Sequence, residues 1–210
     1  MNYTSLKTNI QDICETSFTD DQLALFVQQA EQRIYNTVHI PAMRNVDSSS
    51  LTAGDELYTT PDGYLYTYSL AIVNNDTQTF LLNKDVNFLR EAYPNASVEG
   101  EPKYYALFDD DTFMLAPTPT SGYTTELHYF YSPPSITEVA GGETWLGTNA
   151  PECLLYGSMV QANLFLKGEP DMQQLYEGQY QEALARLRNE SAGKSMQDSY
   201  RYGQPRQAVE

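Results

Sequence analysis

The sequence has few of the residues that enzymes use most often. It contains two histidines and two cysteines, and it lacks both a glycine-rich phosphate loop and a nucleophile-elbow motif. His39 follows an expected helix and His128 lies in an expected strand, and neither has a nucleophile beside it in the sequence. Cys14 and Cys153 lie far apart, with no local partners for a zinc ion. We therefore expect a protein that is not an enzyme and that uses no cofactor and no metal.

Positive charge is also scarce. The chain has 12 Lys and Arg residues against 28 Asp and Glu residues, which gives a net charge of −16. Proteins that grip nucleic acid need clustered cations, so this composition argues against such a function. It is compatible with a protein that lets nucleic acid pass without holding it. It is equally compatible with a surface that is acidic only for solubility.

The sequence has no hydrophobic run long enough to cross a membrane and no N-terminal pattern of positive charge followed by apolar residues. Both cysteines fall within apolar helical patterns, which indicates buried free thiols and suits a reducing compartment. We expect a soluble protein that is made in the cytoplasm.

Helical periodicity marks the first 40 residues. A first apolar face recurs at helical spacing at Leu6, Ile10, Ile13 and Cys14. A second helix begins after Thr19, which can form a capping box with Gln22, while Phe18 can pack onto Leu23. Its apolar stripe consists of Leu23, Phe26, Val27, Ala30 and Ile34. Pro41 ends this helix.

Helical periodicity returns at Ala150. Pro151 suits the first turn of a helix whose stripe is Leu155, Met159, Ala162 and Leu166, and whose wide apolar surface predicts a central position. The link Gly168–Pro170 separates it from a last helix, which carries Tyr176, Tyr180, Ala183, Leu184 and Leu187 on one face.

Between the two helical regions, the pattern changes to short segments rich in Thr, Tyr, Phe, Val and Leu. Strands are predicted at Ser50–Tyr58, Tyr64–Val73, Thr79–Leu82, Tyr104–Phe108, Thr112–Leu115 and Thr124–Tyr131. Turns are predicted at Asn74–Asp76 and Asp109–Asp111, and a short helix at Asn83–Ala92.

These patterns predict an α+β fold. Residues 1–45 and 149–190 are expected to form a four-helix layer, and residues 46–148 an inserted antiparallel β domain. Residues 191–210 are expected to form an extended C-terminal arm, because they have too little aliphatic content for a core.

The arm differs from the acidic body in charge. Its three basic residues, Lys194, Arg201 and Arg206, stand against two acidic ones, and Tyr200 and Tyr202 flank Arg201. Tyr and Arg are common anchors of buried contacts, so the arm suits docking onto a partner. A frayed terminus explains the same composition.

The run Asp109–Asp111 raises the question of calcium. Calcium loops space their ligands at alternate positions and add a distal glutamate, whereas these three acids are consecutive. A solvated turn between two strands accounts for them better. Paired carboxylates for glycoside hydrolysis are available among 28 acids, but no pair is singled out.

Three motifs in the middle of the chain point to a known family. They are D-x-x-F-L-R-E-x-Y-P at Asp85–Pro94, G-x-P-K-Y-Y-A-x-F-D at Gly100–Asp109, and L-x-Y-F-Y-x-P at Leu127–Pro133. With these motifs, the sequence resembles the head-to-tail adaptor (connector) proteins of tailed bacteriophages. The resemblance continues through Thr144–Leu187 and includes the N-terminal helices, so that it covers nearly the whole chain.

The resemblance implies a structural virion protein of the neck, between capsid and tail. Such adaptors form a ring, usually of twelve copies, that joins the portal to the tail nozzle or the next tail ring. DNA is packaged and ejected through the common channel, without specific binding. The C-terminal arm of such adaptors typically docks on the portal, which assigns that role to Lys194, Tyr200, Arg201, Tyr202 and Arg206. The acids we expect to face the channel are Asp20, Asp21, Asp109, Asp110, Asp111 and Glu126.

Three other interpretations remain open at this point. Another neck or tail ring, such as a stopper or tail tube, shares the setting, although the helical layer favours an adaptor. A carboxylate-dependent hydrolase would place its acids in the β domain. A carbohydrate-binding β module is suggested by the 17 tyrosines, but it explains neither the helices nor the arm.

Overall fold

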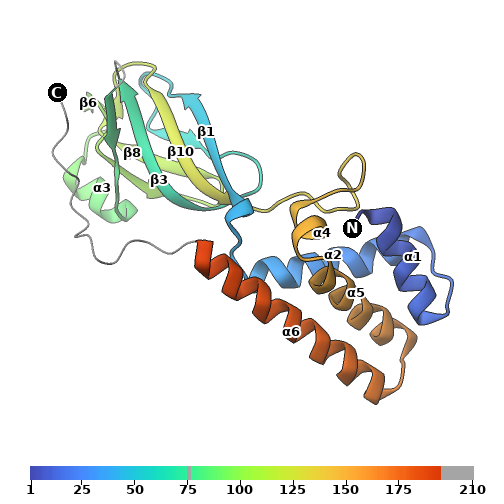
Figure 1. Cartoon of the computed structure of the whole chain (residues 1–210). Coiled ribbons are helices and arrows are strands. Elements are labelled where there is room, and N and C mark those ends of the chain that lie inside the picture. The colour runs from blue at the N-terminus through green and yellow to red at the C-terminus, as the bar shows by residue number, and fades with distance from the viewer. Residues whose placement is uncertain (75–76, 195–210) are drawn as a thin grey trace. The chain divides into compact units, whose positions relative to one another are not determined.

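The computed structural model describes residues 1–74 and 77–194. They divide into two compact units: residues 1–41 together with the chain from Pro134 onward (the helical unit), and residues 42–133 (the β unit). Helices and mainly antiparallel sheets make up the described residues, which confirms the α+β fold class (Figure 1).

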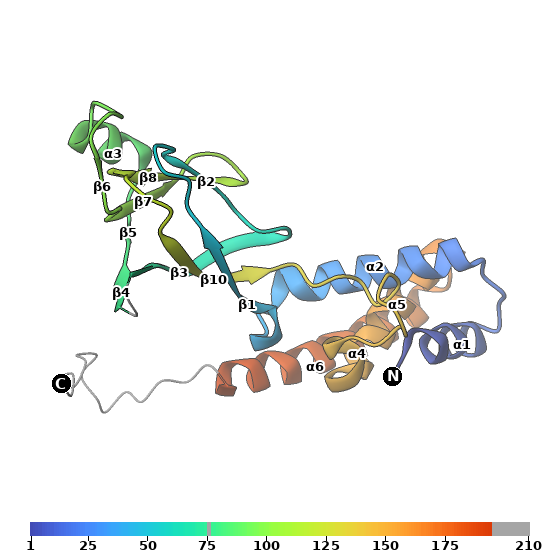
Figure 2. The ribbon, with the colours of Figure 1, turned by 90° about the horizontal axis from the view of Figure 1, so that it is seen from above.

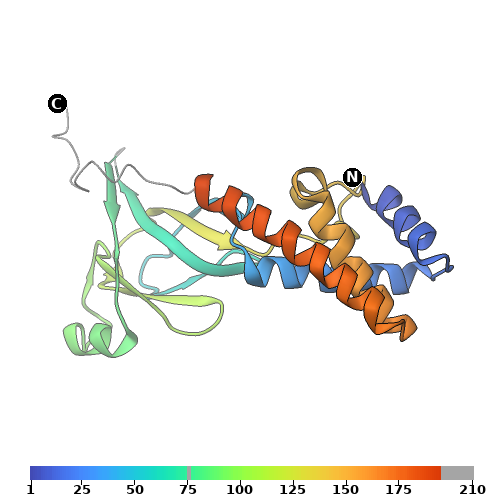
Figure 3. The same cartoon turned by 60° about the horizontal axis from the view of Figure 1, so that its bottom comes forward.

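The helical unit contains five of the helices in the described residues: α1 (Tyr3–Cys14), α2 (Asp20–Thr37), α4 (Trp145–Asn149), α5 (Pro151–Leu166) and α6 (Pro170–Lys194). Helix α5 packs against all four of the others, so its predicted central position is confirmed. Figure 3 shows the long α6 running beside α5. The short α4 has no counterpart in the sequence prediction.

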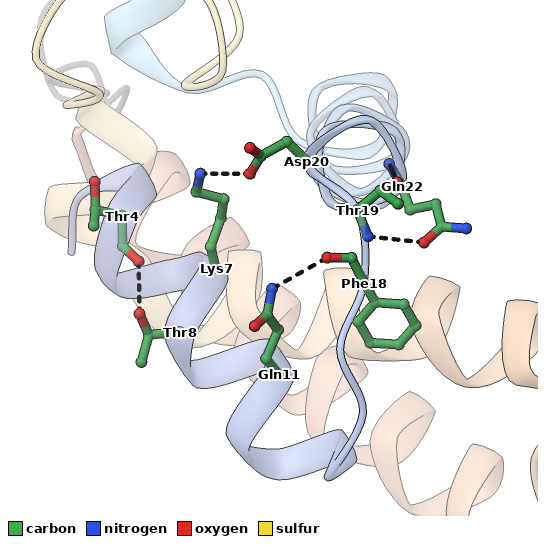
Figure 4. Close-up of polar contacts among 8 residues, drawn as sticks. All are labelled: Thr4, Lys7, Thr8, Gln11, Phe18, Thr19, Asp20 and Gln22. Atoms are coloured by element: carbon green, nitrogen blue, oxygen red, sulfur yellow. Dashed lines mark hydrogen bonds and ion pairs between the residues drawn. The ribbon is translucent and has the colours of Figure 1, made fainter.

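The start of α2 follows the sequence prediction. The Thr19 hydroxyl accepts a hydrogen bond from the Gln22 amide at 3.3 Å, and the Gln22 side chain accepts one from the Thr19 amide at 3.0 Å (Figure 4). Lys7 of α1 reaches Asp20 at 2.8 Å and so ties the two helices together (Figure 4). Phe18 packs edge-on against Phe26, with ring centres 5.3 Å apart.

The predicted apolar stripes hold for α2 and are wrong in part for α1 and α5. Ile13 is 46% exposed and Leu166 is 40% exposed. The buried face of α5 includes Gly157, where an added Cβ would lie 3.1 Å from Ala30 and 3.2 Å from the Tyr180 ring. Because α5 is apolar around much of its circumference, its hydrophobic period does not identify the face that packs.

A 3₁₀ turn at Pro41–Met43 leads from the helical unit into the β unit. The described residues of the β unit form two four-stranded sheets. Sheet A has the order β1-β10-β3-β4, with β1 at Arg44–Ser50, β10 at Thr124–Tyr131, β3 at Tyr64–Asn74 and β4 at Thr77–Phe80. Sheet B has the order β2-β8-β7-β5, with β2 at Leu57–Thr59, β8 at Thr112–Ala116, β7 at Tyr104–Leu107 and β5 at Leu82–Asn83. Strands β6 (Glu99–Gly100) and β9 (Thr118–Pro119) form a small pair.

Side chains from both sheets form the main core of this unit, among them Leu70, Ile72 and Leu127 from sheet A and Phe113 and Leu115 from sheet B. Helix α3 (Val86–Ala92) buries Leu89 in a second cluster with Ala106 and Met114. The β5–β7 and β6–β9 pairs are parallel, which corrects the expectation of a purely antiparallel domain.

Most strand predictions in the described residues are confirmed, including Thr124–Tyr131 and the turn at Asp109–Asp111. The strand predicted at Ser50–Tyr58 is wrong, because β1 ends at Ser50 and β2 begins at Leu57. β1 is an exposed edge strand with a polar sequence, so it lacks the alternation that marks a half-buried strand. The predicted turn at Asn74–Asp76 falls largely on residues outside the described ones.

Two boundaries also differ from the expectation. The chain rejoins the helical unit at Pro134, not at 149, and α6 continues to Lys194, so that Ser191–Lys194 are helical and Ser191 is buried. The buried Glu31 of α2 explains why the chain rejoins the helical unit as early as Pro134. Its carboxylate accepts hydrogen bonds from the Ser135 hydroxyl at 2.5 Å and from the Ile136 amide at 3.0 Å.

Glu31 gives the fold a defined dependence on pH. Burial raises the pKa of its carboxyl, and the hydrogen bonds from Ser135 and Ile136 offset part of that effect. A raised pKa in the folded state means that the contribution of this group to stability is present below its ordinary pKa and is lost as pH rises through the raised value. Glu31→Gln keeps an acceptor for the Ile136 amide without a buried charge, so we expect equal or greater stability near neutral pH.

Glu31→Ala serves as the contrasting variant. It leaves the buried Ile136 amide without its acceptor, and we expect a loss of about 1–3 kcal/mol in the free energy of unfolding. Urea unfolding of both variants between about pH 5 and pH 8 makes the comparison. Equal destabilisation by Gln and Ala near neutral pH would contradict this account of Glu31.

Candidate assembly surfaces

The histidine of the β unit and the two cysteines of the helical unit are each placed by the structure. His128 of β10 shares a hydrogen bond of 2.8 Å with the Glu126 carboxylate. Cys14 and Cys153 are free thiols of the helical unit, whereas His128 belongs to the β unit. Burial raises the pKa of both thiols, that of Cys153 to about 12. Neither cysteine is therefore prepared to act as a thiolate at neutral pH.

The described residues show neither a cluster of metal ligands nor a helix suited to a membrane. Within residues 1–74 and 77–194, no three His, Cys, Asp or Glu side chains gather as metal ligands would. Among these residues, no helix combines the length and the apolar character that a membrane crossing requires.

A groove of about 300 Å³ lies beside the start of α5 and the last turns of α6. Its one arginine, Arg186, contacts Glu152 at 3.1 Å and also pairs with Glu182. Two carboxylates therefore neutralise the guanidinium, and the groove has no free positive charge with which to select an anion.

The six acids that we expected to face a channel are divided between the two units. Asp20 and Asp21 are exposed in the first turn of α2, and Asp20 is paired with Lys7. Glu126 lies on β10 of sheet A, where its carboxylate accepts a hydrogen bond from Gln78 at 3.0 Å. The other three acids form the turn between β7 and β8 of sheet B.

Within that turn, the Asp109 carboxylate accepts a hydrogen bond from the Asp111 amide at 3.1 Å. The carbonyl of Asp111 in turn accepts a hydrogen bond from the Thr60 amide at 2.7 Å. Asp109 thus stabilises the turn itself, as aspartate commonly does at such positions.

Of the five residues expected to bind the portal, Lys194 alone lies within the described residues. It is the last residue of α6, pairs with Glu190 at 2.6 Å, and lies over the Trp145 ring at 5.6 Å. Tyr200, Arg201, Tyr202 and Arg206 lie outside the described residues.

Large exposed apolar side chains occur in both units. In the helical unit, apart from Leu25 of α2, they lie on the segments that end α1 and α5 and begin α6: Ile13, Leu164, Phe165, Leu166, Met172 and Leu175. We call this set the apolar end. Phe165 also packs against Phe18 and Phe26 of the core, so the apolar end is continuous with it. Exposed apolar side chains that lie together are commonly found at protein contacts.

Two further exposed apolar side chains lie at opposite edges of sheet A. Val46 of β1 is 52% exposed and Phe80 of β4 is 60% exposed. Sequence reasoning missed both positions, because only the strand order reveals that β1 and β4 are edges.

A known protein family matches nearly the whole chain. The family described as SU10 adaptor protein matches residues 1–207 of the chain. The chain belongs to the SU10 adaptor family. No curated protein matches it.

The family is one of phage head-to-tail adaptors, which confirms the resemblance found in the sequence. This SU10 adaptor is therefore a structural protein of a bacteriophage, with a place in the virion.

The burial of the two cysteines can be tested by how fast their thiols react in the folded adaptor. Cys153 is buried with a pKa of about 12, so on the order of 10⁻⁵ of it is thiolate at neutral pH. We expect a disulfide reagent such as DTNB to modify Cys14 slowly and Cys153 only after unfolding in guanidinium. The variant Cys14→Ser identifies the reacting thiol. Rapid modification of that variant in its folded form would show that Cys153 is accessible and reactive.

Proposed function

We propose that this SU10 adaptor forms a ring, of twelve copies in the expected case, that joins the portal to the tail nozzle or the next tail ring. The match to the SU10 adaptor family over residues 1–207 carries this proposal. The helices α1, α2, α5 and α6 form the layer that faces neighbouring proteins. The ring lines the DNA channel and serves in genome retention and ejection.

The exposed surfaces support a role in assembly. The apolar end offers contact area on one unit, and sheet A offers two open edges on the other. Contacts that are weak in one pair of copies become strong when they are repeated around a closed ring. Such a protein needs no tight single site.

The proposed contact with the portal lies in the C-terminal arm. Lys194 marks the point where the arm leaves α6, and the two tyrosines and two arginines that follow provide anchors of the type found in buried contacts. An arm that becomes ordered only when it docks would give assembly a direction, because it binds after the portal exists.

Co-sedimentation with portal rings tests this contact. The full chain is compared with a chain that ends at Lys194, which keeps the buried Ser191 and the contact of Lys194 with Trp145. We expect the full chain to bind and the shortened chain to bind at least tenfold more weakly. Alanine at Tyr200, Arg201, Tyr202 and Arg206 should have the same effect, while alanine at Gln204 and Gln207 serves as the matched control. If the full chain does not bind portal rings, the proposed function fails.

We assign to the exposed acids the task of keeping the channel free of bound DNA. A channel lined by cations would hold DNA in a salt-dependent way, whereas a channel lined by acids would not. Asp21 and Asp110 are the best positions for a test, because their carboxylates make no hydrogen bond or ion pair among the described residues. Asp20, Asp109 and Glu126 each have a contact that a substitution would break.

Lysine at Asp21 and Asp110 should slow DNA ejection from assembled particles by roughly threefold or more, with a larger effect at low salt. Asparagine at the same positions removes the charge without reversing it, and we expect a smaller effect. Ejection would be followed by the release of a DNA-binding dye signal. If both lysine variants ejected DNA at the wild-type rate at low salt, the assignment of Asp21 and Asp110 to the channel surface would be wrong.

A further inference from the structure

The two edges of sheet A differ in a way that matters for contact between copies. Figure 2 shows β4 and β1 at opposite ends of the row β4, β3, β10 and β1. All four residues of β4, Thr77–Phe80, are exposed, and none is charged or a proline. Soluble proteins commonly protect an open edge with charge, proline or a bulge, because an unprotected edge pairs with other strands.

The backbone of β4 has hydrogen-bonding groups that point away from the sheet. The Leu81 amide, next in the chain, donates to the Leu70 carbonyl on β3 at 2.9 Å. Because these groups alternate in direction along a strand, the N–H and C=O groups of Gln78 and Phe80 point outward. β4 therefore offers two residues that can pair with another strand.

The opposite edge has the same arrangement. The Leu51 amide donates to the Tyr123 carbonyl at 2.8 Å, in line with the β1–β10 register, so the backbone groups of Val46 and Ser48 point outward. The Val46 amide donates instead to the side chain of its neighbour Asn45, at 2.9 Å. This bond inside one strand can be exchanged for a bond to a second strand.

The side chains at the two edges also match. Phe80, Ala71, Glu126 and Ser48 lie opposite one another across the four strands, so they share the face of sheet A that points away from the core. Val46, two residues before Ser48, lies on that face too. An exposed aromatic side chain at one edge and an exposed β-branched one at the other form a favourable cross-strand pair.

Strand direction is compatible with pairing between copies. Each neighbouring pair in sheet A is antiparallel, so β4 and β1 run in opposite directions. When two copies stand side by side in the same orientation, β4 of one is antiparallel to β1 of the next. Charge also favours β4 as a contact. Two chains that each carry a net charge of −16 repel one another, and the repulsion is small where an uncharged strand forms the contact.

We infer that β4 of one copy adds to β1 of the next copy, with Phe80 opposite Val46 and Gln78 opposite Ser48. In this register both pairs exchange two backbone hydrogen bonds, and sheet A continues from copy to copy. The contact uses two different surfaces of the chain, which is the type that closes into a ring. The inference rests on the proposed ring and names the strands that join it.

Cysteine cross-linking tests the register. The double variant Val46→Cys with Phe80→Cys is made in a Cys14→Ser chain, bound to portal rings and oxidised mildly. Opposed residues of a hydrogen-bonded pair have Cα atoms about 5.5 Å apart, which suits a disulfide. In one chain the two positions are three strand spacings apart, roughly 14 Å, so a bond within a copy is excluded. We expect a ladder of cross-linked copies on a non-reducing gel, and none for either single variant.

The outcomes separate the two proposals. Binding to portal rings without a ladder would overturn the strand pairing and leave the proposed function intact. Absence of binding by the unmodified chain would overturn both. Cross-linked dimers from Phe80→Cys alone would show that β4 pairs with β4 of a second copy and would replace the inferred contact.

Gln78→Pro provides a second measurement. Proline removes an N–H that points outward, so the pairing of β4 with β3 is kept while addition of a new strand is blocked. We expect at least tenfold weaker assembly, with the same urea midpoint as Gln78→Ala, which loses the same side-chain hydrogen bond to Glu126. Gln78→Ala keeps the N–H and serves as the matched control. Normal assembly of the proline variant would overturn the inference.

Discussion

The helical unit depends on the close approach of three helices at Gly157. The absence of a side chain there lets α5 contact Ala30 of α2 and Tyr180 of α6 at distances that a Cβ would only just permit. Tyr180 is buried at this point, and the burial raises its pKa to about 12. The guanidinium of Arg33, which bonds to Glu177, lies over its ring at 4.5 Å. Segments from both ends of the chain thus form one core.

Because this core uses segments from both sides of the β unit, the chain leaves the helical unit before residue 42 and re-enters it after residue 133. Its exit follows α2, and its return is fixed by the Glu31 carboxylate, which binds the amide and hydroxyl of the returning segment. The N-terminus supports the same segment, since the Met1 amino group donates to the Gly147 carbonyl at 2.7 Å. A buried acid is costly, and here hydrogen bonds from one backbone amide and one side-chain hydroxyl offset part of that cost.

The distribution of charge and apolar surface suits a structural protein of a virion. The chain is strongly acidic, yet β4 carries no charged residue and the apolar end exposes six apolar side chains. Under the proposed assembly, repulsion between copies would act on most of the surface and be weakest where β4 meets the next copy. Such an arrangement disfavours random association and favours the specific one.

The sequence by itself determined the local structure and the family. The capping box at Thr19, the stripe of α2, the strand Thr124–Tyr131 and the adaptor motifs are all readable there, because each depends on residues close together in the chain. The tertiary structure alone decided that Glu31 is buried, that Ile13 is exposed, and that β1 and β4 are edges. The reason is physical: burial and strand order depend on which distant segment packs against a residue, and local periodicity carries no record of that partner.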